Sequence, residues 1–517
     1  MVLPPARIQR IGAAFVLFVI AAAVATWLCK PLHGGPAGPD AAASILFFDR
    51  IVTGTRLETF VNTTPKPLLT LILGGLHGIT GGWVAGALAT VLATALAVVL
   101  AAEVVRRVAG IEAAAFAAVA LIGLLSLQVE TSLSYGLPWA FLLWMAAGLL
   151  LLRPEPRYGL AGSMLLLAGL ARPETWIIVG VGMLLLLWRA VRGPRPPREA
   201  WLLLIAWLAL PVLRVHDYLL TGIPLWWIGI ARHSVELAGG RASSLPTVLH
   251  MSADLLLGML PMVIAACAGG LLLVRRQSWI AVAGLVAMGP LILVYTWLLS
   301  IEHINVLSHY LHPAELAIVL AAAVGVGLVL AAGRGRLATA RPRASGPLAV
   351  GVACVVAVAL AVVMARPFTP LSRSARTSTA LEARIALRLE AVEPVLDGLL
   401  PADRSGPAVN PGPMGAPDPA LGYLFVPAHH SLRLSIDLRL PLTRLLGLEP
   451  AHVDLAGGYP PVGSVVYLDG IIEPATVSAA TTPLQVSVPT VVGGVRVVPI
   501  VSDPAAKTWV VRIEPAP

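Results

Sequence analysis

Long apolar runs recur along this sequence as far as residue 364, and they restrict the fold more than any other feature. They fall at about 11–28, 83–105, 111–128, 135–152, 158–171, 175–190, 200–213, 254–274, 279–299, 313–332 and 347–364. Backbone polar groups find no water in hydrocarbon, so runs of this length cross a bilayer as helices. We therefore predict a mainly α, polytopic membrane protein with about eleven transmembrane helices.

The composition agrees with this class and excludes others. Hydrophobic residues make up 57% of the chain and charged residues 12%, well below the roughly 25% that is usual in soluble proteins. The net charge of +9 resides in short arginine clusters between apolar runs, not in a basic stripe with aromatics, so we predict no nucleic-acid partner. The spacing of Cys29, Cys267 and Cys354 suits neither a zinc site nor a disulfide framework.

The distribution of arginine predicts the topology. We expect Pro67–Ile79, which is short and rich in glycine, to lie in the outer interface instead of spanning. One side of the membrane then receives Arg7, Arg10, Arg106, Arg107, Arg153, Arg157, Arg189, Arg192, Arg195, Arg198, Arg275, Arg276, Arg334, Arg336, Arg341 and Arg343. This bias marks the cytoplasmic side, which also holds the N-terminus. Ile11–Leu28 is then a retained signal anchor, although Ala23–Ala25 also resembles a cleavage site.

The same topology places the loops 30–82, 214–253 and 300–312 and the tail outside the cytoplasm. We predict a membrane domain at 1–365 and an extracytoplasmic domain at 366–517. The tail combines an amphipathic helix, Arg373–Leu400, a Pro/Gly-rich linker, Pro401–Pro419, and a small β-rich module. Its β-favouring runs are Ser431–Leu440, Ser464–Leu468, Leu484–Val492 and Thr508–Ile513.

The first outer loop is dense in charge. Between residues 39 and 72 it carries Asp40, Asp49, Arg50, Arg56, Glu58 and Lys66. Charges held beside hydrocarbon are costly, so such a cluster favours a functional site over a passive connection.

The order of motifs in this loop and beyond it resembles the GT-C superfamily of membrane glycosyltransferases. Asp40-Ala41, Phe47-Phe48-Asp49, Gly54 and Pro67-Leu68 follow one another as in its bacterial branch that includes mycobacterial arabinofuranosyltransferases. Further motifs of this branch resemble Glu130-Thr131, Ala171-Arg172-Pro173-Glu174 and His309-Tyr310-Leu311-His312-Pro313. Pro39, Ala42 and His309 depart from the usual Asp, aromatic residue and Arg, and the resemblance ends near residue 330.

This resemblance implies inverting transfer of a sugar from a polyprenyl-phosphate donor to a glycan or lipid acceptor of the cell envelope, at the outer face of a bacterial inner membrane. The Ala/Arg/Gly-rich composition suits a high-GC bacterium, which makes decaprenyl-phosphate arabinofuranose the expected donor and cell wall biogenesis the expected process. The rival classes are a lipid or glycan transporter or flippase and a non-catalytic envelope scaffold. A transporter should show paired halves, and the sequence shows none.

Such a transfer needs a carboxylate that accepts the proton of the acceptor hydroxyl. Asp40, just outside the first predicted span, is our candidate base, and its alternative role is to cap a helix Ala41–Val52. Asp49 lies nine residues further on, so on one continuous helix it points away from Asp40. We interpret Asp49 as structural and keep it as the reserve base.

The departing phosphate needs cationic or polar partners. Our candidates for donor or substrate binding are Lys66, Glu130, Arg172, Glu174, Arg232, His309 and Tyr310. Two of them have structural alternatives: Lys66 as a snorkelling lysine and Arg172 as the ion-pair partner of Glu174. His303, His309 and His312 are too loosely spaced for a metal site. A divalent cation is compatible with the chemistry but is not supported by ligand spacing, and we predict no other cofactor.

Overall fold

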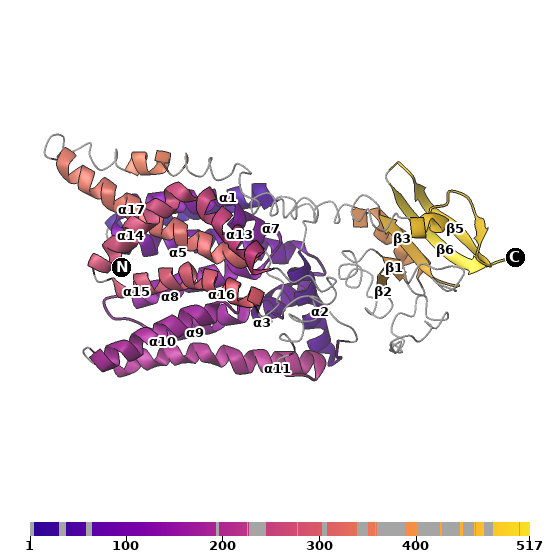
Figure 1. Cartoon of the computed structure of the whole chain (residues 1–517), viewed down its shortest axis with the longest axis horizontal. Helices are drawn as coiled ribbons and strands as arrows, with labels where there is room; N and C mark the ends of the chain where they lie inside the picture. The colour runs from indigo at the N-terminus through magenta and orange to yellow at the C-terminus, as the bar shows by residue number, and fades with distance from the viewer. Residues whose placement is uncertain are drawn as a thin grey trace. The chain divides into compact units, whose positions relative to one another are not determined.

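The computed structural model describes the chain in segments (Figure 1). These are residues 5–29, 38–57, 65–192, 196–224, 226, 244–276, 278–301, 308–338, 350–356, 358, 388–389, 391–400, 424–426, 445–447, 460, 462–469, 479–505 and 507–517. Contacts divide them into two compact units, described separately below. One comprises Met1–Ser44 with Asn62–Thr379, and the other Ile45–Val61 with Ala380–Pro517. The predicted boundary at 365–366 lies outside the described residues.

The first unit is helical. Its helices are α1 (Pro5–Cys29), the start of α2 (Pro39–Thr53), α3 (Pro67–Leu69), η1 (Thr70–Gly74), α4 (Gly75–Thr80), α5 (Val84–Ala109), α6 (Ile111–Ile122), α7 (Leu125–Ser132), α8 (Gly136–Leu151), α9 (Tyr158–Ala171), α10 (Thr175–Arg192), η2 (Arg198–Leu208), α11 (Ala209–Thr221), α13 (Leu245–Gly258), α14 (Leu260–Arg275), α15 (Trp279–Met288), α16 (Pro290–Ile301), η3 (Ser308–Leu311) and α17 (His312–Ala338). Figure 1 shows α8, α9 and α10 running alongside one another.

Several of these helices can cross a membrane. Among the described residues, four are long and apolar enough: Val84–Ala109, Arg198–Thr221, Trp279–Ser300 and His309–Ala331. Two bent pairs raise this to as many as six, and shorter apolar helices cover Ile11–Trp27, Pro67–Thr80, Gly136–Leu151, Tyr158–Ala171 and Thr175–Trp188. The mainly helical, apolar architecture predicted from the sequence is confirmed.

Two runs that the sequence indicated as single straight spans are broken in the structure. The run 111–128 divides into α6 and α7, which meet at 51°, and the run 254–274 divides into α13 and α14, which meet at 83°. Gly123 ends α6, and Pro261 stands in the first turn of α14. Hydropathy carries no information about bends, whereas glycine and proline permit them. The break after α6 turns α7 and its Glu130 toward the candidate site described below.

The helices approach closely where small residues face each other. On α17, Gly325 lies against Ala265 of α14, and Gly269 of α14 lies against Ala321 of α17. A Cβ at either glycine would collide with a backbone carbonyl of the facing helix. Small residues at such crossings let backbones pack without space for lipid, as is usual in membrane helix bundles.

The second unit contains a sheet of six described strands in the order β2-β1-β3-β6-β5-β4. They are β1 (Leu424–Val426), β2 (Leu445–Gly447), β3 (Val465–Asp469), β4 (Thr490–Val492), β5 (Val495–Asp503) and β6 (Thr508–Pro515). The strand pairs β1–β2 and β1–β3 are parallel, and β3–β6, β6–β5 and β5–β4 are antiparallel.

The predicted β-rich module is therefore present, with differences in detail. The run 464–468 is β3 and the run 508–513 is β6. The run 484–492 is strand only in β4, because its first part ends a 3-10 helix, Ala479–Leu484. The strand 431–440, the linker 401–419 and most of the helix 373–400 lie outside the described residues.

The sheet encloses a small core with one buried charged group. Val466, Val511 and Ile513 are among the apolar residues that fill the core. Beside them the buried Asp469 accepts a hydrogen bond from the Tyr467 hydroxyl at 3.0 Å and pairs with Arg388 at 3.1 Å. Burial, together with the charge of Asp469, raises the pKa of Tyr467 above its ordinary value, so this tyrosine stays a donor.

Candidate active site

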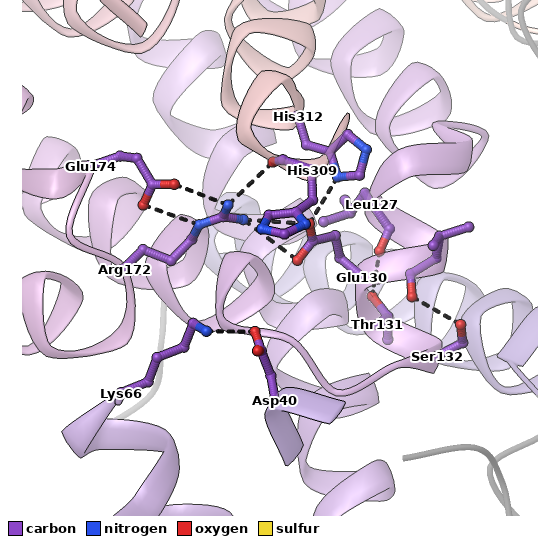
Figure 2. Close-up of polar contacts among 11 residues, drawn as sticks. Asp40, Lys66, Leu127, Glu130, Thr131, Ser132, Arg172, Glu174, His309 and His312 are labelled. Atoms are coloured by element: carbon purple, nitrogen blue, oxygen red, sulfur yellow. Dashed lines mark hydrogen bonds and ion pairs between the residues drawn. The ribbon is translucent and has the colours of Figure 1, made fainter. Parts of the chain in front are cut away.

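Two groups of charged side chains lie at the end of the helical unit where α8, α10 and α17 begin (Figure 2). The first is the pair Asp40 and Lys66. The second, which we call the Arg172 cluster, consists of Glu130, Arg172, Glu174 and His312. Five separate stretches of the sequence therefore meet in one part of the fold.

Asp40 stands in the first turn of α2, which begins at Pro39. The amides of Ala41 and Ala42 donate to the Gly38 carbonyl, so Gly38 precedes the helix and the predicted start at Ala41 is two residues late. Asp40 therefore lies inside the first turn of the helix and not at the capping position that the alternative role required. A carboxylate within the first turn is nonetheless favoured by the helix dipole.

Gly38 fixes where this helix begins. Its amide donates to the Leu133 carbonyl at 3.0 Å, just beyond the end of α7. A Cβ at Gly38 would lie 2.5 Å from the Tyr135 ring, so no larger residue fits there without movement. The start of α2, and with it Asp40, is thus docked on the turn between α7 and α8.

Lys66 is the residue that precedes α3, and its side chain reaches Asp40. Its Nζ donates to Asp40 Oδ2 at 2.5 Å, and the two side chains remain 12% and 17% exposed. Pro65 and Pro67 flank the lysine and fix the backbone dihedral on each side of it. The pair is therefore held in place, yet it is accessible to a ligand.

Arg172 occupies the turn between α9 and α10 and is only 4% exposed. It donates to Glu174 at 3.1 and 3.3 Å, and it makes longer contacts of 3.4 and 3.5 Å with Glu130. Its Nη2 also donates to the His309 carbonyl at 3.2 Å. Arg172 thereby ties α7, the α9–α10 turn and η3 together.

The charges within this cluster balance one another. Burial alone would lower the pKa of the Arg172 guanidinium, but the carboxylates of Glu174 and Glu130 outweigh burial and raise it. His312 Nδ1 lies 2.8 Å from Glu130 Oε1, which gives that carboxylate a second partner. Glu130 and Glu174 are 1% and 2% exposed, so both depend on these contacts.

His309 and Tyr310 belong to η3, the 3-10 turn whose His309 carbonyl binds Arg172. Their rings stack with centroids 4.7 Å apart, and the ring of Tyr135 meets His309 edge-on at 5.9 Å. The same Tyr135 ring lies against Gly38, the residue that precedes α2 and Asp40. The carbonyl of His309 is the one that Arg172 holds, so the cluster supports the wall of the Asp40–Lys66 site.

Of the remaining predicted residues, Asp49 joins neither group. Asp49 is exposed on α2, and the helix is continuous from Asp40 to Asp49 as expected. Arg232 and His303 lie outside the described residues. Within the described segments, no group of three or more His, Cys, Asp and Glu side chains is arranged to hold a metal ion.

Tyr135 and Thr175 also contribute to this part of the fold, although no sequence motif includes them. The Tyr135 ring contacts both Gly38 and His309, and the Thr175 hydroxyl accepts a hydrogen bond from Trp144 at 3.1 Å. Thr175 follows Glu174 directly at the start of α10, and Tyr135 directly precedes α8. That position was the available signal, but the contacts themselves join segments far apart in sequence.

No protein-family model and no curated protein matches this sequence. Solved structures do match its fold. The structure of ArnT from Cupriavidus metallidurans bound to undecaprenyl phosphate is similar over 96% of this chain and 97% of its own, with a TM-score of 0.53 at 16% identity. This chain has the GT-C fold. The oligosaccharyltransferase of Archaeoglobus fulgidus in its apo form is similar over 88% of this chain and 69% of its own, with a TM-score of 0.50 at 14% identity.

The motifs that carry the resemblance also lie near one another in the fold. In this structure the motifs around Asp40, Glu130, Arg172 and His309 converge on one end of the helical unit. The ArnT structure holds undecaprenyl phosphate, and the other structure is that of an oligosaccharyltransferase. Kinship with the arabinofuranosyltransferase branch remains a prediction.

Proposed function

We propose that this chain transfers a glycosyl group from a polyprenyl-phosphate-linked sugar to a hydroxyl of an acceptor, with inversion. The observation that carries the proposal is the Asp40–Lys66 pair, an accessible carboxylate and ammonium at the end of a GT-C helical unit. The ArnT structure with undecaprenyl phosphate supports the class of donor.

In the proposed reaction Asp40 acts as the general base. Its Oδ2 binds Lys66, and Oδ1 receives the proton of the acceptor hydroxyl. The acceptor oxygen then attacks the anomeric carbon from the face opposite the donor phosphate. The bond from that carbon to the phosphate oxygen breaks, and its electron pair leaves with the phosphate.

Lys66 is the proposed partner of the leaving phosphate. Its ammonium lies 2.5 Å from Asp40, so charge that develops on the phosphate is stabilised next to the base. The contacts of Arg172 support its ion-pair alternative, because its donors face Glu174, Glu130 and the His309 carbonyl. Arg232 remains a predicted phosphate contact in a segment outside the described residues.

The topology follows from the arginine asymmetry. We propose about eleven spans with the Asp40 end and the domain 366–517 outside the cytoplasm, in the inner membrane of a bacterium. Reporters fused after Arg107, Arg198 or Arg343 should then report a cytoplasmic location, and one after Pro370 an extracytoplasmic location. A cytoplasmic reporter at Pro370 would contradict this topology.

The finer substrate proposal is decaprenyl-phosphate arabinofuranose as donor and a cell-envelope glycan or lipid as acceptor. It rests on the motif resemblance and on the high-GC composition. The purified chain in proteoliposomes should transfer radiolabelled sugar from a polyprenyl-phosphate donor and not from the matching nucleotide sugar. If the chain transfers sugar only from the nucleotide sugar, polyprenyl phosphate is not the donor carrier. If the labelled donor crosses the bilayer and no sugar is transferred, the chain is a flippase.

A further inference from the structure

A cavity of about 220 Å³ lies between helices α5, α8, α10, α14, α15 and α17, and no residue of the candidate active site lines it. Its walls are almost entirely apolar and include Val104, Gly182, Gly284 and Val324. The cavity extends along α8 from Trp144 to Leu152. Since α8 begins at the active-site end, Leu152 lies at the opposite end of the helical unit.

A basic depression adjoins the cavity at this opposite end. It is lined by Arg106, Arg107 and Arg153, together with leucines of α8, and it shares Leu152 with the cavity. Glu103 pairs with Arg106 at 2.6 Å and with Arg107 at 2.9 Å. Three guanidinium groups and one carboxylate leave the depression with two net positive charges.

Two tryptophans mark the level of the membrane interface here. Trp188, near the end of α10, and Trp279, at the start of α15, have ring centroids 6.2 Å apart, and both are partly exposed. Tryptophan gathers at the boundary between hydrocarbon and headgroups. The cavity residues of α10 and α15 lie beyond these rings toward the protein interior, at hydrocarbon depth.

We propose that this combined site binds one anionic phospholipid. The lipid phosphate lies against Arg106, Arg107 and Arg153, and one acyl chain enters the cavity past Leu152. Arginine is suited to phosphate because its planar fork donates two parallel hydrogen bonds. A net positive depression beside an apolar slot therefore selects a ligand with one anionic headgroup and one long alkyl chain.

The site differs from the one proposed for the sugar donor. The Trp144 indole donates to Thr175, three residues beyond Arg172, so the cavity ends beneath the Arg172 cluster. A lipid whose phosphate sits at Arg153 therefore presents its headgroup at the end of the unit opposite Asp40. The occupant is a lipid of the other leaflet.

Native mass spectrometry of the full chain in detergent tests this proposal. The probes are dioleoyl phosphatidylglycerol, dioleoyl phosphatidylcholine with the same chains, and sn-glycerol 3-phosphate, which has the phosphate without chains. We expect one retained phosphatidylglycerol, weaker retention of phosphatidylcholine and no retention of glycerol phosphate. Equal retention of the two phospholipids, or retention of glycerol phosphate, would overturn the proposal.

Matched variants locate the site. Gly182→Leu fills the cavity, since a Cβ there meets nothing within 4 Å, and Gly180→Leu places the same side chain on α10 outside the cavity lining. We expect only Gly182→Leu to weaken phosphatidylglycerol binding. Arg153→Gln should weaken it about fivefold, the change expected for one cation near an anionic lipid surface, and the exposed Arg157→Gln should not.

Each variant is also checked by thermal unfolding without lipid. If Gly182→Leu and Arg153→Gln unfold normally and still bind phosphatidylglycerol like their controls, the lipid lies elsewhere and the proposal fails. If a polyprenyl phosphate displaces phosphatidylglycerol at equal concentration, the cavity belongs to the donor lipid, and this too overturns the proposal.

Discussion

The Asp40–Lys66 pair and the Arg172 cluster contain the same kinds of charged group but differ in burial. Asp40 and Lys66 are joined by one short ion pair and remain 17% and 12% exposed. Arg172 is 4% exposed and contacts two carboxylates and one carbonyl. A fully bonded, buried charge network holds structure, whereas a solvent-accessible pair keeps the capacity to bind a substrate.

The two regions are also connected. Arg172 holds the carbonyl of His309, and Tyr135 contacts both His309 and Gly38, the residue before α2. The buried cluster thus fixes the wall against which Asp40 is placed. This division of roles is open to test by substitutions on each side.

The largest effect on stability is expected for Arg172→Ala. Removing the arginine leaves Glu130 and Glu174 buried without their cation, which should cost about 3–5 kcal/mol in the free energy of unfolding. Thermal or denaturant unfolding in detergent measures this loss. The exposed Arg157→Ala is the control and should change stability by about 0.5 kcal/mol or less. If Arg172→Ala is as stable as the native chain, the ion pairs are not structural and Arg172 is again the candidate phosphate contact.

Lys66→Ala should act mainly on transfer. Losing a hydrogen bond to a charged group costs about 1.5–3 kcal/mol, which corresponds to a tenfold to hundredfold lower transfer rate. Lys66→Arg keeps the charge and should restore part of the rate. If Lys66→Ala transfers sugar at the native rate, Lys66 only extends its charge to the membrane interface. The partner of the phosphate must then be sought around Arg232.

The smallest of these effects is expected for Gly38→Ala, which probes the connection between the regions. The added Cβ would press on the Tyr135 ring and on the Leu133 carbonyl, and overpacking of this kind costs about 1–3 kcal/mol. Because the start of α2 must shift, transfer should fall even at temperatures where the variant is folded. Gly54→Ala, at the end of the same helix, adds a Cβ in open space and controls for loss of glycine, although its positive φ of 67° adds local strain.

The sequence predicted what depends on composition and on neighbours in the chain. Apolar runs located the helices, and the two-residue spacing of Arg172 and Glu174 raised their ion pair as the alternative to phosphate binding by Arg172. The bends at Gly123 and before Pro261 were not predicted, because apolarity is the same on both sides of each break. The contacts of Glu130 with His312 and of Asp40 with Lys66 depend on tertiary packing, which no local pattern encodes.

The role of Asp40 as general base is tested by comparing the initial transfer rate and the unfolding temperature of Asp40→Asn with those of the native chain. Asparagine keeps the shape of the side chain but cannot accept the acceptor proton. The rate should therefore fall by about 10²–10⁴-fold, the usual contribution of a general base, with the fold and donor binding retained. Asp49→Asn, on the exposed part of α2, should transfer sugar normally. A near-native rate in Asp40→Asn would show that Asp40 is not the general base, and Asp49 would be the next candidate.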